Sequence, residues 1–193
     1  MDTSASFLES LRHAPEDGAW AKLVDLYSPL IRGWLKRRGT AESDVDDVAQ
    51  DVMAVVVRRF PEFRRQPHTG SFRAWLRKIT VNCLRDHWRR DNRQPFAVGG
   101  TDFGAIVDQL EDPHSELSRL WDREHDEHVT QYLLSSIRAE FSEKTWILFQ
   151  RFAIDGLNAD EVAAEHGTTA NAVFIAKSRV MAMLRERGKG LID

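Results

Sequence analysis

A row of polar and basic side chains follows one side of a helix that the sequence predicts from Ser71 towards Arg90. At steps of four, three, four and four, the row comprises Lys78, Asn82, Arg85, Arg89 and Arg93, with Trp75 at its upstream end. Such spacing places side chains on one helix face. Cationic side chains bind phosphates, and neighbouring aromatic rings stack on unpaired bases. The row therefore favours a surface for single-stranded or melted nucleic acid; the alternative is a core tryptophan beside solvated arginines.

An acidic cluster precedes this row, on a helix expected to begin at Ser43 as N-cap and to end at Phe60-Pro61. Its members are Asp44, Asp46, Asp47, Gln50 and Asp51. Carboxylates in a first helical turn are favoured by the helix dipole, which explains the first three without a function. Gln50 and Asp51 lie beyond that turn. An acidic face suits a basic protein surface and repels DNA, so the cluster favours a protein partner, with a simply solvated face as the alternative.

A third pattern, near the end of the chain, is typical of a helix-turn-helix. Asn158 and Glu161 form a capping box for a short helix, Gly167 suits a tight turn, and a longer helix follows Thr169 to about Arg187. The side chains expected to face outward on this longer helix are Asn171, Phe174, Ile175, Ser178 and Arg179. Polar ones can contact base edges or phosphates, and apolar ones can contact a thymine methyl. An ordinary helical hairpin is the alternative.

Evidence for an enzyme is weak. His125 and His128 are three residues apart, which makes a metal-dependent enzyme conceivable, but no third cluster of ligands accompanies them. They lie in a strongly charged segment, so we expect both to be exposed. The single cysteine, Cys83, is expected to be a core thiol. We therefore expect no catalytic residues, no bound metal and no cofactor.

The elements that must position these groups are all helical. No segment alternates with a period of two, and apolar residues recur every three or four positions. The 193 residues carry 27 Lys and Arg against 30 Asp and Glu, a net charge of -3 that is spread unevenly. Residues 1–95 have a net charge of +4, residues 96–128 of -7 and residues 129–193 of 0. We expect an all-α protein with two small domains, 1–95 and 129–193, joined by a flexible acidic linker, 96–128, although Ser115 to Ala139 also has a helical pattern.

Segments that would direct the chain to a membrane are not evident. The longest apolar run, Val52 to Val57, is far shorter than the roughly 18 residues that span a bilayer. The first 17 residues include four acidic ones and no hydrophobic stretch typical of a signal peptide. We expect a cytoplasmic protein without membrane insertion.

Taken in order, the motifs resemble bacterial RNA polymerase sigma factors of the extracytoplasmic-function (ECF) group of the sigma-70 superfamily. The resemblance rests on DVDDVAQDV at 44–52, GSFRAWLRKI at 70–79 with Asn82, Asp86, Arg89 and Arg90, and NADEVAAEHG at 158–167 followed by Ala172-Val173 and Lys177-Ser-Arg-Val180. It implies a transcription initiation factor with region 2 at about residues 20–93 and region 4 at about 129–187, and it implies core RNA polymerase and promoter DNA as partners. It leaves an anti-sigma factor open as a further partner.

The resemblance also implies residue roles. The acidic cluster would bind the polymerase clamp, through Asp44, Asp46, Asp47, Gln50 and Asp51. The following helix would recognise and melt the minus-ten element, through Phe72, Trp75, Lys78, Asn82, Arg85, Asp86, Arg89 and Arg90. Region 4 would contact the minus-thirty-five element, through Thr169, Asn171, Phe174, Ile175, Ser178 and Arg179. The acidic linker would thread the interior of the polymerase.

One departure concerns the last set of contacts. Many members of the family carry Lys/Arg-Ser-Arg directly after the valine that corresponds to Val173, whereas Phe174-Ile175-Ala176 stands there in this chain and Lys177-Ser178-Arg179 follows. Phe174 and Ile175 could instead pack on another domain or on a regulator. A stand-alone helix-turn-helix regulator, acting without polymerase, is the alternative function.

Overall fold

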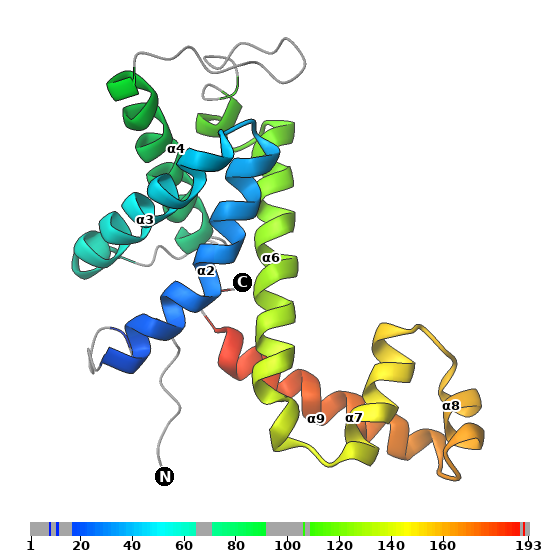
Figure 1. Ribbon diagram of the computed structural model, residues 1–193. Coiled ribbons are helices and arrows are strands. Elements are labelled where there is room, and N and C mark those ends of the chain that lie inside the picture. Colours follow the sequence, from blue (N-terminus) through cyan, green and yellow to red (C-terminus); the bar gives the residue numbers. More distant parts are fainter. Residues whose placement is uncertain are drawn as a thin grey trace. The chain divides into compact units, whose positions relative to one another are not determined.

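The computed structural model describes Leu8, Leu11, Ile106, Leu191 and residues 17–64, 71–91 and 109–189. In these parts of the chain the regular structure is helical, without a β-strand, which confirms the predicted all-α class (Figure 1). The main helices are α2 (Asp17–Arg37), α3 (Glu42–Arg59), α4 (Ser71–Asp91), α6 (Glu116–Ile137), α7 (Glu143–Phe149), α8 (Ala159–Glu165) and α9 (Ala170–Gly188). Short helical turns are η1 (Phe60–Glu62), η2 (Arg138–Glu140) and η3 (Gln150–Ile154), the last a π-helix. None of the described helices is long and apolar enough to cross a bilayer.

Two compact units divide the described residues. The first unit includes α2, α3, α4 and the chain up to Val129, and the second includes Thr130–Lys189. Helix α6 begins in the first unit and ends in the second. We call residues 116–129 the first part of α6.

The first part of α6 differs from the flexible linker expected over 96–128. A stripe of buried side chains recurs at every fourth position of this part, at Leu117, Trp121, His125 and Val129. Trp121 meets Trp34 of α2 edge to face, with ring centroids 5.0 Å apart, and Figure 1 shows α6 running alongside α2. The stripe holds this segment in the first unit, because withdrawing these side chains would return apolar and aromatic surface to water. The remainder of the expected linker, apart from Ile106 and residues 109–115, lies outside the described residues.

The core of the first unit is unusually aromatic. Tyr27 and Trp34 of α2, Phe60 of η1 and Phe72 of α4 are at most 1% exposed. Phe72 lies 5.4 Å from Tyr27 and 5.5 Å from Phe63, measured between ring centroids. The valines of α3, which the sequence predicts as an apolar stripe, face the same core: Val45, Val48, Val52 and Val56. This core fixes the orientation of α3 and α4 and therefore of the charged side chains on their outer faces.

The end points of the helices follow local signals with one exception. Gly39 has a φ of 81° after α2, a left-handed conformation that glycine adopts without strain. The prediction that Ser43 is the N-cap of the next helix is wrong, because α3 begins at Glu42 and Ala41 is its N-cap. The Ser43 hydroxyl instead donates to Asp44 Oδ1 at 2.7 Å. The run of acidic residues stabilises this helix start through the dipole in place of a side-chain cap.

The second unit contains the predicted helix-turn-helix. The capping box of Asn158 and Glu161 is present at the start of α8, and Gly167 has a φ of 58° in the turn before α9. Small side chains let the two helices approach, because Ala163 and Ala176 are buried beside Val162 and Val173. Further along α9, Val180 packs with Ile137 and Phe149. The first turn of α9 is capped by Thr169, whose hydroxyl accepts from the Ala172 backbone N–H at 3.2 Å.

Candidate nucleic-acid and protein-binding surfaces

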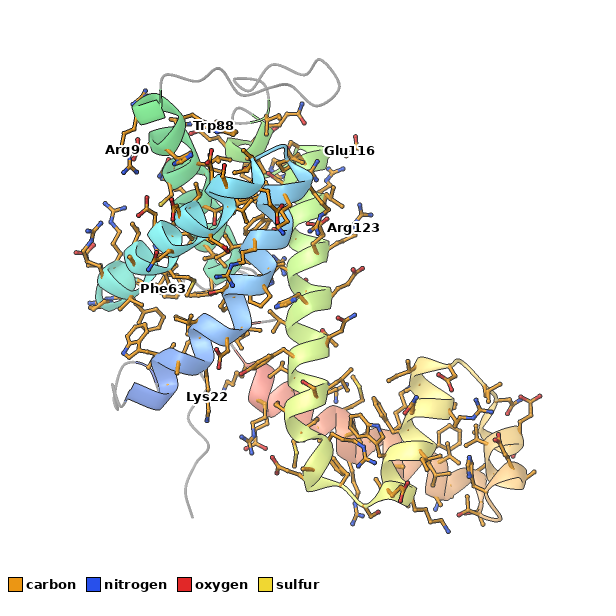
Figure 2. All side chains as sticks on the ribbon, viewed as in Figure 1. Lys22, Phe63, Trp88, Arg90, Glu116 and Arg123 are labelled. Atoms are coloured by element: carbon orange, nitrogen blue, oxygen red, sulfur yellow. The ribbon has the colours of Figure 1, made fainter. Side chains whose placement is uncertain are left out.

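The acidic cluster of α3 divides between two directions. Asp46, Asp47 and Gln50 are exposed, and we call these three residues the outer acidic face. Asp44 and Asp51 instead turn towards α4, where Asp44 lies 3.3 Å from His87 and Asp51 lies 3.2 Å from Arg90. Figure 2 labels Arg90 close to the carboxyl end of α4. Two of the five predicted residues therefore brace α3 against α4, and three remain presented to solvent.

A groove lies beside the outer acidic face, between α2 and α3. Its volume is about 770 Å³, and the residues that line it are Val24, Ser28, Arg32, Asp46, Ala49, Gln50, Met53, Ala54, Val57 and Arg58. Val24 and Val57 are each 38% exposed, which is high for large apolar side chains. Asp46 closes one edge by bonding to Arg32 at 2.7 Å. An apolar floor with a charged margin suits a protein segment. The sequence analysis did not predict the groove. The one local signal of it was Val57, an apolar residue of α3 that falls outside the buried valine stripe.

Helix α4 presents only part of the predicted basic row to solvent. Lys78, Asp86, Arg89 and Arg90 are exposed, Asn82 and Arg85 are half-buried, and Arg93 lies outside the described residues. Trp75 is half-buried, with its ring 5.0 Å from Phe63 and 5.6 Å from Phe72. Phe72 is 1% exposed within the aromatic core, so its ring is not available to a base in this structure. In this structure Phe72 supports the Trp75 ring, and its contact with DNA stays a prediction.

Acidic residues of the expected linker neutralise the inner arginines of α4. Arg73 bonds to Asp126 at 2.9 Å and Arg77 to Asp122 at 3.0 Å. Arg85 bonds to Glu111 at 2.5 Å. Burial lowers the pKa of Arg77, and the nearby Asp122 carboxylate opposes this shift. The sequence analysis did not predict these ion pairs. A signal was present, because Arg73 and Arg77 are four residues apart and therefore lie on one helix face, and the same holds for Asp122 and Asp126.

His125, expected to be exposed, is fully buried. Its Nε2 lies 3.3 Å from the Tyr27 hydroxyl and its Nδ1 lies 3.0 Å from Asp126 Oδ1. Both ring nitrogens of His125 therefore have a polar partner, the Tyr27 hydroxyl at Nε2 and the Asp126 carboxylate at Nδ1. His128 Nε2 contacts the Leu26 carbonyl oxygen at 2.6 Å. The two histidines therefore fasten α6 to α2, and the described residues contain no group of three possible metal ligands.

The hydrogen bonds around Asp126 set the protonation of this buried contact. Burial acts to raise the pKa of the Asp126 carboxyl, but the hydrogen bond from His125 and the charge of Arg73 outweigh it, so the pKa lies below its ordinary value of 3.8. Burial raises the pKa of Tyr27, and the Asp126 charge adds to the effect. At neutral pH the Asp126 carboxyl is therefore ionised and the Tyr27 hydroxyl is not, and His125 lies in contact with both groups.

The lowered pKa of Asp126 predicts a pH-dependent stability. A carboxyl whose pKa is lower in the folded state stabilises the fold above its unfolded pKa, and this stabilisation is lost as the pH falls through the folded value. We expect Asp126→Asn to lower the thermal unfolding midpoint at neutral pH, with a difference from the unaltered chain that shrinks below about pH 4. Thermal unfolding of both proteins, followed by circular dichroism from about pH 3 to 7, measures this difference in midpoint. Glu127→Gln, an equal charge change at an exposed position of α6, is the control; an equal effect of both variants would contradict the role of Asp126.

Cys83 matches its prediction as a core thiol. It is 8% exposed, and burial together with the charges of Asp51 and Asp86 raises its pKa to about 11. A thiol with so high a pKa is almost entirely protonated at neutral pH and is a poor nucleophile.

The predicted residues on the outward side of α9 and at its N-cap are all exposed: Thr169, Asn171, Phe174, Ile175, Ser178 and Arg179. Phe174 is 52% exposed and Ile175 is 48% exposed, on the side opposite the buried stripe of α9. The Phe174 ring leans edge to face on Phe152 of η3, at 5.3 Å between centroids. Lys177 lies over the Phe152 ring, with Nζ 5.1 Å from its centroid. The surface combines apolar and polar groups that fit a major groove.

The chain is similar in sequence to known RNA polymerase sigma factors. Residues 23–94 match the family Sigma-70 region 2. The chain is 31% identical over 90 residues to the ECF RNA polymerase sigma factor RpoE of Cereibacter sphaeroides, covering 47% of this chain and 48% of that relative. It is 27% identical over 187 residues to the RNA polymerase sigma factor NccH of Alcaligenes xylosoxydans xylosoxydans, covering 94% and 95%. The match to the first relative thus spans about half of its length.

A solved structure of CnrH in complex with the cytosolic domain of CnrY also aligns with the chain. The sequence identity is 23%, the alignment covers 95% of both chains, and the TM-score is 0.37.

Proposed function

Since the chain belongs to the ECF group of the sigma-70 family, we propose that it is a transcription initiation factor that binds core RNA polymerase and directs it to promoters. It would act in the cytoplasm and have no catalytic activity of its own. The observation that carries the proposal is the pairing, within one unit, of an exposed acidic face on α3 with basic and aromatic side chains on α4. A separate helix-turn-helix unit supplies a second surface for DNA.

The polymerase would dock on the outer acidic face and the adjoining groove. Asp46, Asp47 and Gln50 offer acceptors to a basic surface, while Val24 and Val57 offer apolar area. Charge complementarity guides the encounter, and the apolar floor retains the partner. Asp44 and Asp51 would contribute indirectly, because their contacts with His87 and Arg90 link α3 to α4.

Promoter DNA would contact the two units separately. On α4, Trp75 offers a half-buried ring for stacking, Asn82 a half-buried amide, and Lys78, Arg89 and Arg90 exposed cations near Asp86. These groups suit the melted minus-ten element. On α9, Asn171, Ser178 and Arg179 offer polar contacts to the minus-thirty-five element, with Thr169 at the helix start and Phe174 and Ile175 between them.

Run-off transcription tests the proposal directly. The purified chain is mixed with core polymerase and a template that carries a candidate promoter, and a specific transcript is the expected result. A gel-shift assay with the chain alone is run in parallel, because a stand-alone helix-turn-helix regulator binds its operator without polymerase. A strong shift without core enzyme, together with no transcript, would favour the regulator.

An apolar contact to the minus-thirty-five element follows from the exposure of Ile175. We expect Ile175→Ser to lower transcription about five-fold, since a lost apolar contact to a thymine methyl costs on the order of 1 kcal/mol. Core binding should stay unchanged. Replacing thymine by deoxyuridine in the minus-thirty-five element removes the methyl group. It should therefore remove most of the difference in transcription between the unaltered chain and the Ile175→Ser variant.

The matched control is Ile154→Ser, since Ile154 lies on η3 rather than α9 and is 55% exposed. If both serine variants transcribe equally, Ile175 has no part in promoter recognition.

A further inference from the structure

Phe152 of the π-helix η3 contacts two residues of α9 at once. Its ring meets the Phe174 ring edge to face, with centroids 5.3 Å apart, and Lys177 Nζ lies 5.1 Å from its centroid. An ammonium over the face of an aromatic ring is attracted by the negative charge of that face. We call Phe152, Phe174 and Lys177 the Phe152 cluster, and all of it lies within the second unit.

The Phe152 ring is held in place by its surroundings. It is half-buried and packs against the apolar core of the helix-turn-helix, which includes Val162 and Val173. The preceding residue, Arg151, donates to both carboxylate oxygens of Glu165 on α8, at 3.2 and 3.1 Å. The π-helix is therefore tied to α8 through Arg151 and to α9 through Phe152. Such helices are rare and are frequent at functional sites.

Lys177 lies at the edge of the outward side of α9. By helical periodicity it falls between the exposed Phe174 and the buried Val173, and it is itself exposed. A helix with its side chains is about as wide as the major groove of DNA, so a helix in that groove has its flanks against the phosphates on either side. The position of Lys177 on such a flank suits a phosphate contact.

A lysine that is ordered before DNA arrives binds more tightly than a mobile one. Immobilising a long side chain on binding lowers the affinity by about two- to ten-fold. Because the Phe152 ring restricts Lys177 in the free protein, less of this loss remains to be met when DNA binds. The ammonium has three N–H donors, so it can lie over the ring and still donate to a phosphate oxygen.

We propose that Lys177 binds a phosphate of duplex DNA and that Phe152 is the residue that positions it. The proposal rests on the proposed function in one respect, that α9 enters the major groove of promoter DNA. It gives a role to the first residue of Lys177-Ser178-Arg179, which stands three residues later here than in many members of the family. It also adds a residue from η3, outside the helix-turn-helix itself.

The salt dependence of DNA binding tests the phosphate contact. The full chain, in complex with core polymerase, is titrated with a fluorescently labelled promoter duplex from about 50 to 200 mM salt. Lys177→Met removes the ammonium and keeps an apolar stem, so the affinity should fall about ten-fold and the salt slope by about one. Lys144→Met, at an exposed position of α7, is the matched control and should change neither. An unchanged slope in Lys177→Met would overturn the contact.

Four variants test the positioning by Phe152. Phe152→Leu keeps an apolar side chain but removes the ring, so the affinity should fall about four-fold with an unchanged salt slope, because Lys177 still reaches the phosphate but must first be ordered. In a Lys177→Met background the same substitution should have no further effect. Phe152→Tyr keeps a ring face and should keep the affinity. Phe141→Leu removes another half-buried ring, one that packs on Trp146, and should also keep it.

The double substitution separates positioning from general support of the fold. If Phe152→Leu costs the same affinity with and without the Lys177 ammonium, or if Phe152→Tyr binds as weakly as Phe152→Leu, Phe152 does not position Lys177. Thermal unfolding followed by circular dichroism confirms that each variant is folded.

The outcome is separable from that of the proposed function. Run-off transcription by the unaltered chain, together with unaltered DNA binding by Lys177→Met, would remove the phosphate contact and leave the initiation factor. If no complex with core polymerase forms, the same variants are titrated with the chain alone. A loss of affinity that depends on both Phe152 and Lys177 would then support the pair, while the initiation factor would be abandoned.

Discussion

Reversing the charge of Asp47 to arginine is expected to lower the affinity for core RNA polymerase by about 100-fold, equivalent to about 3 kcal/mol. Asp47 is exposed on the outer acidic face, next to the groove between α2 and α3. An arginine there would place like charges opposite a basic partner surface, which costs several kcal/mol. The measurement is the dissociation constant for core polymerase by biolayer interferometry at fixed ionic strength, because this contact is salt-dependent.

Two comparisons isolate the effect of Asp47. Glu186→Arg makes the same charge change at an exposed position of α9 and should leave the affinity for core polymerase unchanged. Asp51→Arg should affect both polymerase binding and the stability of the first unit, because Asp51 also bonds to Arg90. An Asp47→Arg chain that binds core polymerase normally would exclude the outer acidic face from the docking site.

Truncating Trp121 to alanine should destabilise the first unit by about 3–5 kcal/mol, the range for large aromatic truncations in a core. Trp121 is 1% exposed and packs edge to face on Trp34. The loss is large enough to unfold a substantial share of the unit at physiological temperature, so transcription should fall with it. Urea titration followed by circular dichroism measures the change in the free energy of unfolding.

Arg123→Ala is the matched control on the same helix. Its side chain is exposed, and Figure 2 shows it on α6 among the outward-facing groups. Its substitution should change the free energy of unfolding by less than about 0.5 kcal/mol, as is usual for surface positions. Equal stability of the Trp121 and Arg123 variants would mean that the first part of α6 does not support the first unit.

Local signals predicted the helix-turn-helix well. The capping box at Asn158, the glycine at 167 and the cap at Thr169 each act within a few residues, so the sequence contains the whole argument for them. The exposed set on α9 was predicted for the same reason, since periodicity alone separates it from the buried Val173, Ala176 and Val180. Ser43 failed because a serine is only a cap if the helix starts there, and acidic residues beside it allow an earlier start.

The first part of α6 could not be placed from composition. The net charge of -7 over residues 96–128 indicates repulsion and solvation when each charge is considered alone. In the structure, Asp122 and Asp126 meet arginines more than forty residues earlier in the chain, and His125 meets Tyr27. These partners are tertiary, so the sequence indicates them only indirectly, through the four-residue spacing of Leu117, Trp121, His125 and Val129 and of Asp122 and Asp126.

The ion pairs on α4 have a consequence for the thermodynamics of DNA binding. Six arginines and lysines lie on this helix, at positions 73, 77, 78, 85, 89 and 90. Four of them, Arg73, Arg77, Arg85 and Arg90, already have carboxylate partners within the protein. An arginine that exchanges a carboxylate for a phosphate leaves that carboxylate to recruit a cation, which offsets the cation released from DNA. The dependence of affinity on salt should therefore reflect mainly Lys78 and Arg89, and it should be shallower than the number of basic residues suggests.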